Sequence, residues 1–194
     1  MKLFYTKRSP YARKVRVLVL EKGIRLDLID EDLAHKSQKL LDSNPLGKVP
    51  TLILDNGDVI YDSVVICQYL DEQDSKTRLI PLSGEARYEV LKWESMADDM
   101  VTIAIYVYME KVRHPQDFHA QFVTNSENAI LNGYQYIEAH LNELGEFNLA
   151  SIAVASAIGY IHFRLPHLKV QGKLAQWFEQ INKRPSMQQT IPVV

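Results

Sequence analysis

The chain has 194 residues, enough for one domain or two small ones. Hydrophobic residues make up 46% of it, which supports a substantial core, and a formal net charge of −2 gives no electrostatic basis for binding nucleic acid or an anionic membrane. Because Cys67 is the one cysteine, no intrachain disulfide can form. The longest nearly apolar run, residues 149–161, is too short to span a bilayer, so we expect a soluble cytoplasmic protein.

The N-terminal stretch predicts a strand, a helix and a second strand. Residues 3–5 are apolar and read as a buried strand. Ser9 and Pro10 are the residue types preferred at the cap and the first position of a helix, and Gly23 is typical of a helix end. Residues 25–30 alternate as a strand does. The helix between the two strands is a crossover, so the strands should be parallel.

A hairpin completes the predicted sheet. Asn56-Gly57 separates two β-rich runs, and a tight hairpin turn needs the positive φ angles that these residues tolerate. The pattern predicts a short helix at residues 36–42, strands at 51–54 and 59–61, and a helix at 63–71. The order of elements up to this point is therefore β-α-β-α-β-β-α.

Two short stretches in this region have ligand-binding chemistry. Pro50 cannot donate to a sheet, and X-Pro is the peptide bond that tolerates the cis form, so a turn at Val49-Pro50 would leave the Val49 main chain free for a peptide-like ligand. Asp62 and Ser63 stand where a helix begins. Its unpaired N–H groups can hold an anion, and the two side chains can receive an ammonium group or cap the first turn.

The second half of the chain shows no convincing strand. A polar linker is followed by amphipathic and apolar helical patterns, and the helices are expected at residues 84–113, 118–144, 151–165 and 174–183. The third of these is apolar nearly all round, as a central buried helix is. The chain thus divides into an α/β domain at residues 1–74, a linker at 75–83 and an all-helical domain at 84–194.

Three motifs occur in this framework, in order: Ser9-Pro10-Tyr11-Ala12-Arg13-Lys14-Val15, Asn44-Pro45-Leu46-Gly47-Lys48-Val49-Pro50, and Asp62-Ser63-x-x-Ile66. In this order and spacing the chain resembles the cytosolic glutathione S-transferase superfamily. More narrowly, it resembles bacterial serine-type members with a Ser-Pro-x-x-Arg-Lys-Val motif. The resemblance covers essentially the whole chain and implies an α/β thioredoxin-like N-terminal domain followed by an all-α C-terminal domain.

The resemblance also implies a glutathione site in the N-terminal domain. Pro50 would be cis, and the Val49 main chain would pair with the cysteinyl part of glutathione. Asp62 would receive the γ-glutamyl ammonium group and Ser63 the γ-glutamyl carboxylate. Lys48 would lie near the glycyl carboxylate, with Lys36 as a second cation there, although an exposed lysine is more often simply solvated.

Ser9 is the residue that the resemblance places at the glutathione sulfur. Its hydroxyl would donate a hydrogen bond to a thiolate, the reactive form of a thiol, and it could cap the helix at the same time. Tyr5 is the rival hydroxyl, since other branches of the superfamily use a tyrosine nearby, but the apolar run around it favours a core position. Cys67, well inside its helix, is expected to be packed rather than nucleophilic.

Further expectations concern substrates and partners. Side chains that could line a second-substrate pocket are Tyr11, Tyr106, Tyr108 and Met109. The implied activity is a glutathione-dependent transferase acting on an electrophilic small molecule, or a thiol–disulfide or peroxide reductase, with glutathione as co-substrate and no metal. The resemblance implies a homodimer. The alternative is a non-catalytic protein of the same fold, such as an RNA-polymerase-associated stress protein.

One departure from the family pattern concerns the central helix. Relatives open it with Ser/Thr-x-x-Asp, a capping box in which the carboxylate follows the cap by three residues. We expect Ser151 to be this cap, which places Val154 where the carboxylate should be. The sequence therefore predicts that this helix end contributes about 1 kcal/mol less to the free energy of unfolding than in relatives. A Val154→Asp replacement should then raise the melting temperature.

Overall fold

The computed structural model describes residues 1–73 and 78–193. The chain divides into two compact units: Met1–Leu82 together with Pro185–Val194, and Ser83–Arg184. Residues 75–77 of the predicted linker lie outside the described residues. Among the helices of the described residues, none combines the length and apolar character needed to cross a membrane.

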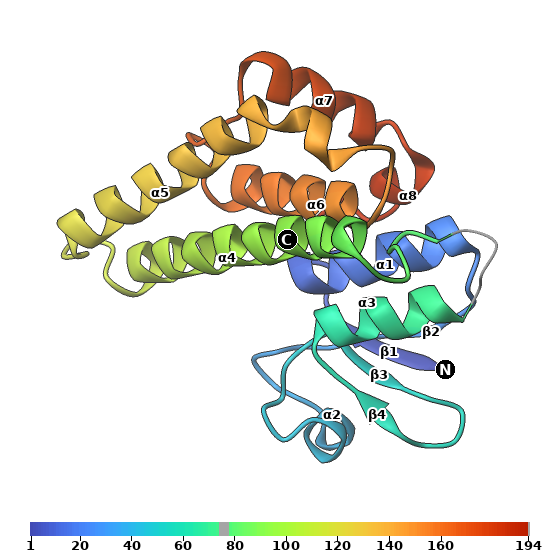
Figure 1. Ribbon diagram of the computed structural model, residues 1–194. Coiled ribbons are helices and arrows are strands. Elements are labelled where there is room, and N and C mark those ends of the chain that lie inside the picture. The colour runs from blue at the N-terminus through green and yellow to red at the C-terminus, as the bar shows by residue number, and fades with distance from the viewer. Residues whose placement is uncertain (74–77, 194) are drawn as a thin grey trace. The chain divides into compact units, whose positions relative to one another are not determined.

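The N-terminal unit is built on a four-stranded mixed sheet with the strand order β2-β1-β3-β4 (Figure 1). The strands are β1 (Lys2–Tyr5), β2 (Asp27–Asp30), β3 (Thr51–Ile53) and β4 (Val59–Ile60). β1 and β2 are parallel, while β3 is antiparallel to both β1 and β4. The predicted crossover and hairpin are therefore confirmed, and the fold is the expected thioredoxin-like arrangement.

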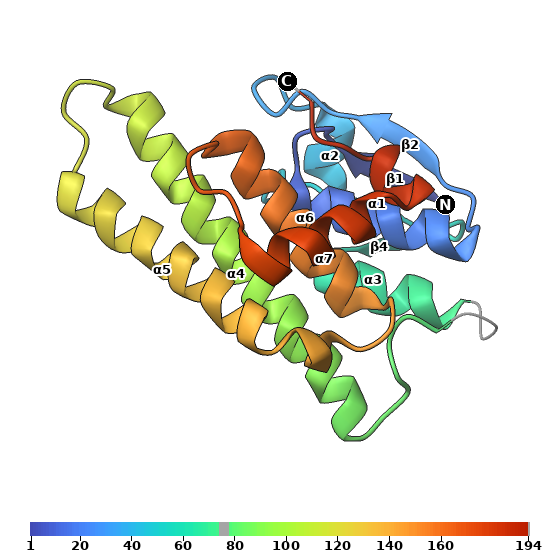
Figure 2. The ribbon, with the colours of Figure 1, turned by 90° about the horizontal axis from the view of Figure 1, so that it is seen from above.

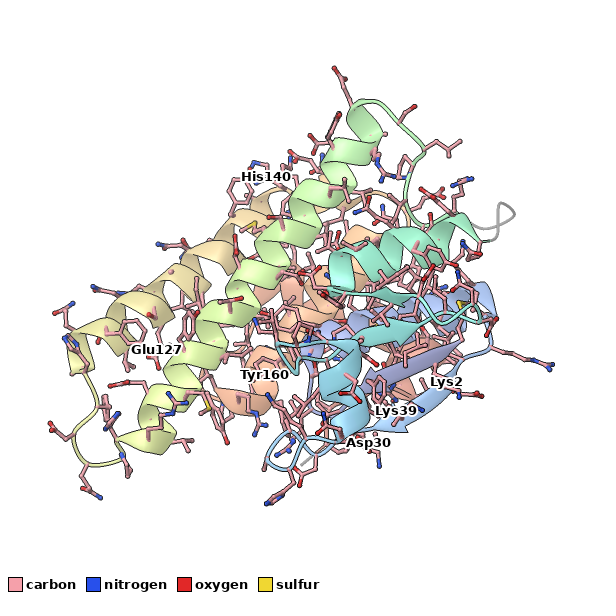
Figure 3. The ribbon with its side chains drawn as sticks, turned by 90° about the horizontal axis from the view of Figure 1, so that it is seen from below. Lys2, Asp30, Lys39, Glu127, His140 and Tyr160 are labelled. Carbon is pink, nitrogen blue, oxygen red and sulfur yellow. The ribbon has the colours of Figure 1, made fainter. Side chains whose placement is uncertain are left out.

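Helices cover both faces of this sheet. Helices α1 (Pro10–Lys22) and α3 (Ser63–Glu72) pack together on one face, and the short α2 (Gln38–Ser43) lies on the other (Figure 1). Successive strand residues point to opposite faces. Accordingly the Tyr5 ring meets Arg16 of α1, whereas the Phe4 ring lies 6.0 Å from the ammonium of Lys39, which Figure 3 labels on α2.

The boundaries of α1 follow from its end residues, as the sequence predicts. The Ser9 side chain accepts a hydrogen bond from the Ala12 N–H, and Pro10 fills the first helical position, where an N–H would have no partner. At the other end Gly23 has φ +65, and its N–H bonds back to carbonyls of the last turn. Only glycine adopts that conformation without a steric penalty, so the helix ends there.

The second unit is all-helical (Figure 2). Its elements are α4 (Glu85–Arg113), α5 (Ala120–Ala139), the 3₁₀ turn η1 (Leu141–Leu144), α6 (Leu149–Arg164) and α7 (Gly172–Asn182). Residues 149–158 of α6 are all buried, and both α4 and α7 pack against α6, so α6 is the core helix that its apolar composition predicts. The predicted helix 118–144 is interrupted: α5 ends at Ala139 and η1 follows.

The start of α6 corrects the sequence analysis. Asn148, not Ser151, is the N-cap: its side-chain oxygen accepts a hydrogen bond from the Ser151 N–H at 3.2 Å. Ser151 therefore occupies the N3 position, and Val154 lies one turn further in, 1% exposed. The assignment of Ser151 as the cap is wrong, because the helix begins two residues before it, at Leu149. Val154→Asp is therefore not expected to raise the melting temperature.

The C-terminal end of the chain also differs from the expected division. Residues 185–193, which include α8 (Pro185–Gln188), belong with the N-terminal unit and not with the helical domain predicted at 84–194. The physical reason is a set of contacts with α1. The Arg13 guanidinium donates to the Met187 carbonyl at 3.3 Å, and that of Arg16 donates to the Gln189 carbonyl at 3.4 Å. We call residues 185–193 the return segment.

Candidate functional site

The Ser9 side chain lies at the turn between β1 and α1. The Ser9 N–H bonds to the Thr6 carbonyl at 3.1 Å, which closes this turn. The hydroxyl oxygen accepts from the Ala12 N–H, also at 3.1 Å. A serine hydroxyl has two acceptor lone pairs and one O–H donor, so capping the helix leaves the donor available. Ser9 is half-buried, so a ligand can reach it.

Tyr5, the alternative hydroxyl-bearing residue, is held away from the start of α1. It is 7% exposed, and its ring lies 4.8 Å from the Arg16 guanidinium. Arg16 is seven residues after Ser9, or about 10 Å further along the helix axis at 1.5 Å per residue. The tyrosine thus packs under the middle of α1, as the core interpretation expects, and the contact favours Ser9 over Tyr5 as the group at the helix start.

The loop before β3 is braced from within. The Asn44 amide donates to the Thr51 hydroxyl at 3.0 Å and to the Lys48 carbonyl at 3.3 Å, and the Thr51 hydroxyl donates to the same carbonyl at 2.8 Å. Val49 is half-exposed and the Val49–Pro50 bond is cis, which confirms the expected form of this bond. The Tyr61–Asp62 bond is cis as well.

Gly47 brings Lys36 against this loop. Gly47 is buried with φ +56, and a Cβ added there would lie 2.8 Å from the Lys36 Cδ and 2.9 Å from its Nζ. The ammonium group therefore rests on the glycine, next in sequence to Lys48. The two predicted cations thus come from one small region, and the glycine is what allows their close approach.

Asp62 caps α3. Its carboxylate accepts from the Val64 N–H at 3.1 Å and remains exposed, while Ser63, in the first turn, is 2% exposed. An exposed carboxylate at a helix N-terminus can receive a cation, and the N–H groups of that turn can receive an anion. A free α-amino acid group carries both charges, an ammonium and a carboxylate, so the start of α3 could bind such a group.

The strand pairings place Ser9, Val49 and Asp62 at the same end of the strands, which we call the site edge of the sheet. Phe4 pairs with Thr51 in antiparallel β1 and β3, so the end of β1 adjoins the beginning of β3. Leu52 pairs with Ile60, so the end of β4 adjoins the same point. Ser9 follows β1, Val49 precedes β3 and Asp62 follows β4. The sheet therefore gathers the predicted sulfur, backbone and amino acid contacts along the site edge.

Comparison with known proteins identifies the family. Residues 3–78 match the family model described as glutathione S-transferase, N-terminal domain. The GST-like protein YibF of Escherichia coli is 30% identical over 84% of this chain and 83% of its own length. The chain belongs to the glutathione S-transferase family. That assignment agrees with the sheet topology and with the motif order found in the sequence.

Solved glutathione S-transferases superpose over the whole chain. A family member from Pseudomonas fluorescens, with bound glutathione, is 37% identical, with a TM-score of 0.90 over 100% of this chain and 99% of that one. A glutathione S-transferase from Methylobacillus flagellatus, also with glutathione bound, is 36% identical, with a TM-score of 0.93 over 99% of both chains. A stringent starvation protein A homolog from Coxiella burnetii is 38% identical over 40% of this chain and 36% of its own length.

The four residues predicted to line a second-substrate pocket have different surroundings in this chain. Tyr108 accepts a hydrogen bond from Arg164 at 3.2 Å, with the guanidinium 4.4 Å from its ring, so it takes part in packing within the helical unit. Tyr106 is 59% exposed on the same helix, and Met109 is half-buried. Tyr11 is half-buried in the first turn of α1. Their assignment to a pocket stays a prediction.

Other features of the glutathione S-transferase chain lie apart from these residues. Cys67 is completely buried, as expected of a packed side chain. Within residues 1–73 and 78–193, no group of three His, Cys, Asp or Glu side chains could hold a metal ion. A groove of about 620 Å³ lies between α4 and α5, and none of the predicted site residues lines it.

The burial of Arg13 does not follow from the sequence. Arg13 is 3% exposed, one turn after Ser9, and burial followed by the nearby charge of Arg16 lowers its pKa to about 10. The signal available was the Arg13-Lys14 pair between the apolar residues Ala12 and Val15. By residue type, Arg13, Lys14 and Arg16 suggest either a solvated basic face or an Arg13 that braces the site or a neighbouring subunit. The sequence does not reveal the burial, because the partners of Arg13 lie at the far end of the chain.

Proposed function

We propose that the protein is a glutathione-dependent transferase of the bacterial serine type, in which Ser9 stabilises the glutathione thiolate for attack on an electrophilic small molecule. The observation that carries the proposal is the glutathione-bound relative from Pseudomonas fluorescens, 37% identical over the whole chain. The site edge, formed by Ser9, Val49 and Asp62, supplies the matching groups in this protein.

Five groups are proposed to hold the tripeptide around Ser9. The Val49 main chain, positioned by Pro50, would pair with the cysteinyl residue. Asp62 and Ser63 would take the ammonium and the carboxylate of the γ-glutamyl end, at the start of α3. The remaining contacts are with the glycyl carboxylate, for which Lys36 and Lys48 are the proposed cations.

The energy available at Ser9 is sufficient for the chemistry. A thiol with a pKa near 8.5 is only a few per cent thiolate at pH 7. A hydrogen bond to a charged acceptor contributes about 1.5–3 kcal/mol, and the α1 N-terminus adds about 0.3–1 kcal/mol. At about 1.4 kcal/mol per pKa unit, these terms together lower the thiol pKa by about one to three units. A shift of about two units or more would leave most of the bound glutathione as thiolate at neutral pH.

The test is the ultraviolet thiolate absorbance of bound glutathione, measured against pH. We expect Ser9→Ala to raise the apparent thiol pKa by about one to two units, because the donor to sulfur is lost, and to lower the rate of conjugation with an aryl halide. Ser9→Thr keeps a hydroxyl and should stay close to the parent. Ser37 caps α2 in the same way, so Ser37→Ala controls for the loss of a cap alone.

The result that overturns the assignment of Ser9 is a parent-like thiol pKa in Ser9→Ala. Failure of the folded parent to bind glutathione overturns the enzyme altogether. That outcome favours the second candidate, a non-catalytic binding protein, for which the partial match to a stringent starvation protein A homolog is the supporting observation. Conjugation and peroxide or disulfide reduction use the same thiolate, so assays with an aryl halide, a peroxide and a mixed disulfide decide the reaction class.

Assembly and location are part of the proposal. The family relationship favours a homodimer and a cytoplasmic protein. Sedimentation equilibrium on the purified chain should give twice the monomer mass, 22.3 kDa. A monomer at micromolar concentration would remove the dimer from the proposal and leave the glutathione site as it stands.

A further inference from the structure

The return segment lies along the same side of α1 that begins at Ser9. Ser9, Arg13 and Arg16 are at positions i, i+4 and i+7, which share one helix face. Arg13 donates through Nε to the Thr190 hydroxyl at 3.4 Å and through a terminal nitrogen to the Met187 carbonyl at 3.3 Å. A segment from the far end of the chain thus holds the helix that carries the proposed sulfur ligand.

All the partners of Arg13 are neutral. The return segment, residues 185–193, has no charged side chain. Arg13 is 3% exposed, and its hydrogen bonds go to a hydroxyl and a carbonyl, with no carboxylate in ion-pair contact among the described residues. The Thr190 hydroxyl in turn donates to the Ser186 carbonyl at 2.8 Å, which fixes its orientation. The guanidinium charge is therefore held in place but not neutralised.

The charge remains present at neutral pH. Burial, and then the charge of Arg16, lower the Arg13 pKa to about 10, still far above 7. The other charged groups near this face are on α1 and β2, and they include Lys14, which is buried next to Arg13. Arg16 lies over the Tyr5 ring and is influenced by Asp30, and Glu21 accepts from the Ser186 hydroxyl. None of these carboxylates is paired with Arg13.

The main chain of Arg13 is bonded to the turn that carries Ser9. The Arg13 N–H donates to the Ser9 carbonyl at 2.9 Å in the first turn of the helix, and the two residues are about 6 Å apart along the helix axis. A buried cation stabilises a nearby anion more than an exposed one does, because solvent screens it less. An anion beside the Ser9 hydroxyl would therefore experience both the helix N-terminus and the Arg13 charge.

We infer that the return segment is part of the catalytic apparatus: Thr190 and the Met187 carbonyl hold Arg13 as an uncompensated cation behind Ser9, and this charge makes the bound glutathione thiol more acidic. Arg13 and Thr190 are positioning residues, because neither is assigned a contact with the substrate. The inference rests on the proposed function and adds to it a group that acts on the thiol from behind the helix start.

The experiment measures the thiol pKa of bound glutathione, from thiolate absorbance against pH, in Arg13→Met, Arg13→Lys and Thr190→Val. We expect Arg13→Met to raise this pKa by about one unit, a tenfold loss of acidity, while the KM for glutathione changes less than twofold. Arg13→Lys should recover most of the effect, because it restores the charge. Thr190→Val, nearly the same size, should give a smaller rise in the same direction.

Arg8 provides the matched control. It is also an arginine near Ser9 but is exposed, so solvent screens it and Arg8→Met should leave the thiol pKa unchanged. Equal shifts in Arg8→Met and Arg13→Met would overturn the inference, as would a parent-like pKa in folded Arg13→Met or Thr190→Val. If Arg13→Met does not fold, Thr190→Val decides the matter. A parent that binds no glutathione defeats the proposed function and this inference together, whereas binding with unchanged pKa defeats the inference alone.

Discussion

His162 shows how a single side chain can make the stability of the helical unit depend on pH. Its Nε2 accepts a hydrogen bond from the Val170 N–H at 3.1 Å, and its ring meets the edge of Phe178 at 5.3 Å. An accepting Nε2 must be unprotonated, so this bond requires the neutral ring. Burial, and then the charge of Lys169, lower the His162 pKa from its usual 6.5.

The sign of the effect follows from linkage. The unfolded chain takes up the proton at about pH 6.5 and the folded chain only at a lower pH, so the unfolded state binds more protons in that interval. Stability from this residue is complete above about pH 6.5 and falls as the pH drops toward the folded pKa. We expect His162→Gln, which keeps an acceptor but does not titrate, to flatten this part of the curve of unfolding free energy against pH.

Urea denaturation between pH 7.5 and 5, taken at half-unit steps, measures this curve. His114 is exposed at the end of α4, so His114→Gln is the control and should reproduce the parent slope. A parent-like slope in His162→Gln would show that the Val170 contact has no part in the acid response.

At the scale of residues, the sequence predicted positions whose chemistry is local. Ser9 and Asp62 stand directly before helices, and a polar side chain there caps the helix whatever the rest of the chain does. Arg13 could not be predicted in this way. Its burial depends on residues more than 170 positions away, as the sequence separation of its partner Met187 shows. Residue type alone suggests a solvated arginine.

At the scale of elements, the start of α6 shows where local reasoning failed. Both Asn148 and Ser151 are good capping residues, and they are three positions apart, so either gives a plausible helix start. The structure selects Asn148, whose amide also donates to the Leu144 carbonyl at 2.9 Å. This second bond ties the helix start to η1. It involves a turn that the sequence analysis had merged into the preceding helix.

The capping assignment is tested by Asn148→Ala and Val154→Asp. We expect Asn148→Ala to lower the free energy of unfolding by about 1 kcal/mol, because the Ser151 N–H loses its acceptor. Val154 is 1% exposed, so Val154→Asp would bury a carboxylate and should destabilise the protein by more than the loss of the cap does. Thermal and urea unfolding measure both. A gain in stability for Val154→Asp would restore Ser151 as the cap.

A buried ion pair joins the ends of two helices in the N-terminal unit. The Lys22 ammonium at the end of α1 lies 2.9 Å from the Asp71 carboxylate of α3, and both side chains are at most 1% exposed. The same carboxylate accepts from the Leu79 N–H at 2.9 Å and the Ile80 N–H at 3.1 Å. The Asp71 side chain thus links α1 and α3 to the main chain at residues 79–80.

Removing one partner should be costly because the other charge stays buried. We expect Lys22→Met to lower the free energy of unfolding by about 3–5 kcal/mol. Asp71→Ala should cost more, since two backbone N–H groups also lose their acceptor. The exposed pair of Lys7 and Asp30, at 3.6 Å, is the control, and Lys7→Met should cost less than about 1 kcal/mol. Similar losses for Lys22→Met and Lys7→Met, in urea, would contradict this account.

At the scale of the molecule, the order of elements and the family followed from the sequence, whereas the division into units did so only in part. Periodicity and turn residues are local signals, and they predicted the mixed sheet and the helical half. The return of residues 185–193 to the N-terminal unit is a contact between chain ends. No local pattern marks it, because a short uncharged segment with two prolines is compatible with either unit.

Matched core replacements can show to which unit the return segment belongs. Met187, in α8, and Ile158, in α6, are both 0% exposed, and truncating either to alanine should cost about 2–5 kcal/mol. If residues 185–193 stabilise the N-terminal unit, Met187→Ala should speed amide hydrogen exchange in α1 and leave α6 protected. Ile158→Ala should do the reverse, because local opening follows the contacts that were lost. Amide exchange measured by mass spectrometry on peptides from the two helices distinguishes these patterns. If Met187→Ala speeds exchange in α6 and leaves α1 unchanged, the return segment belongs with the helical unit.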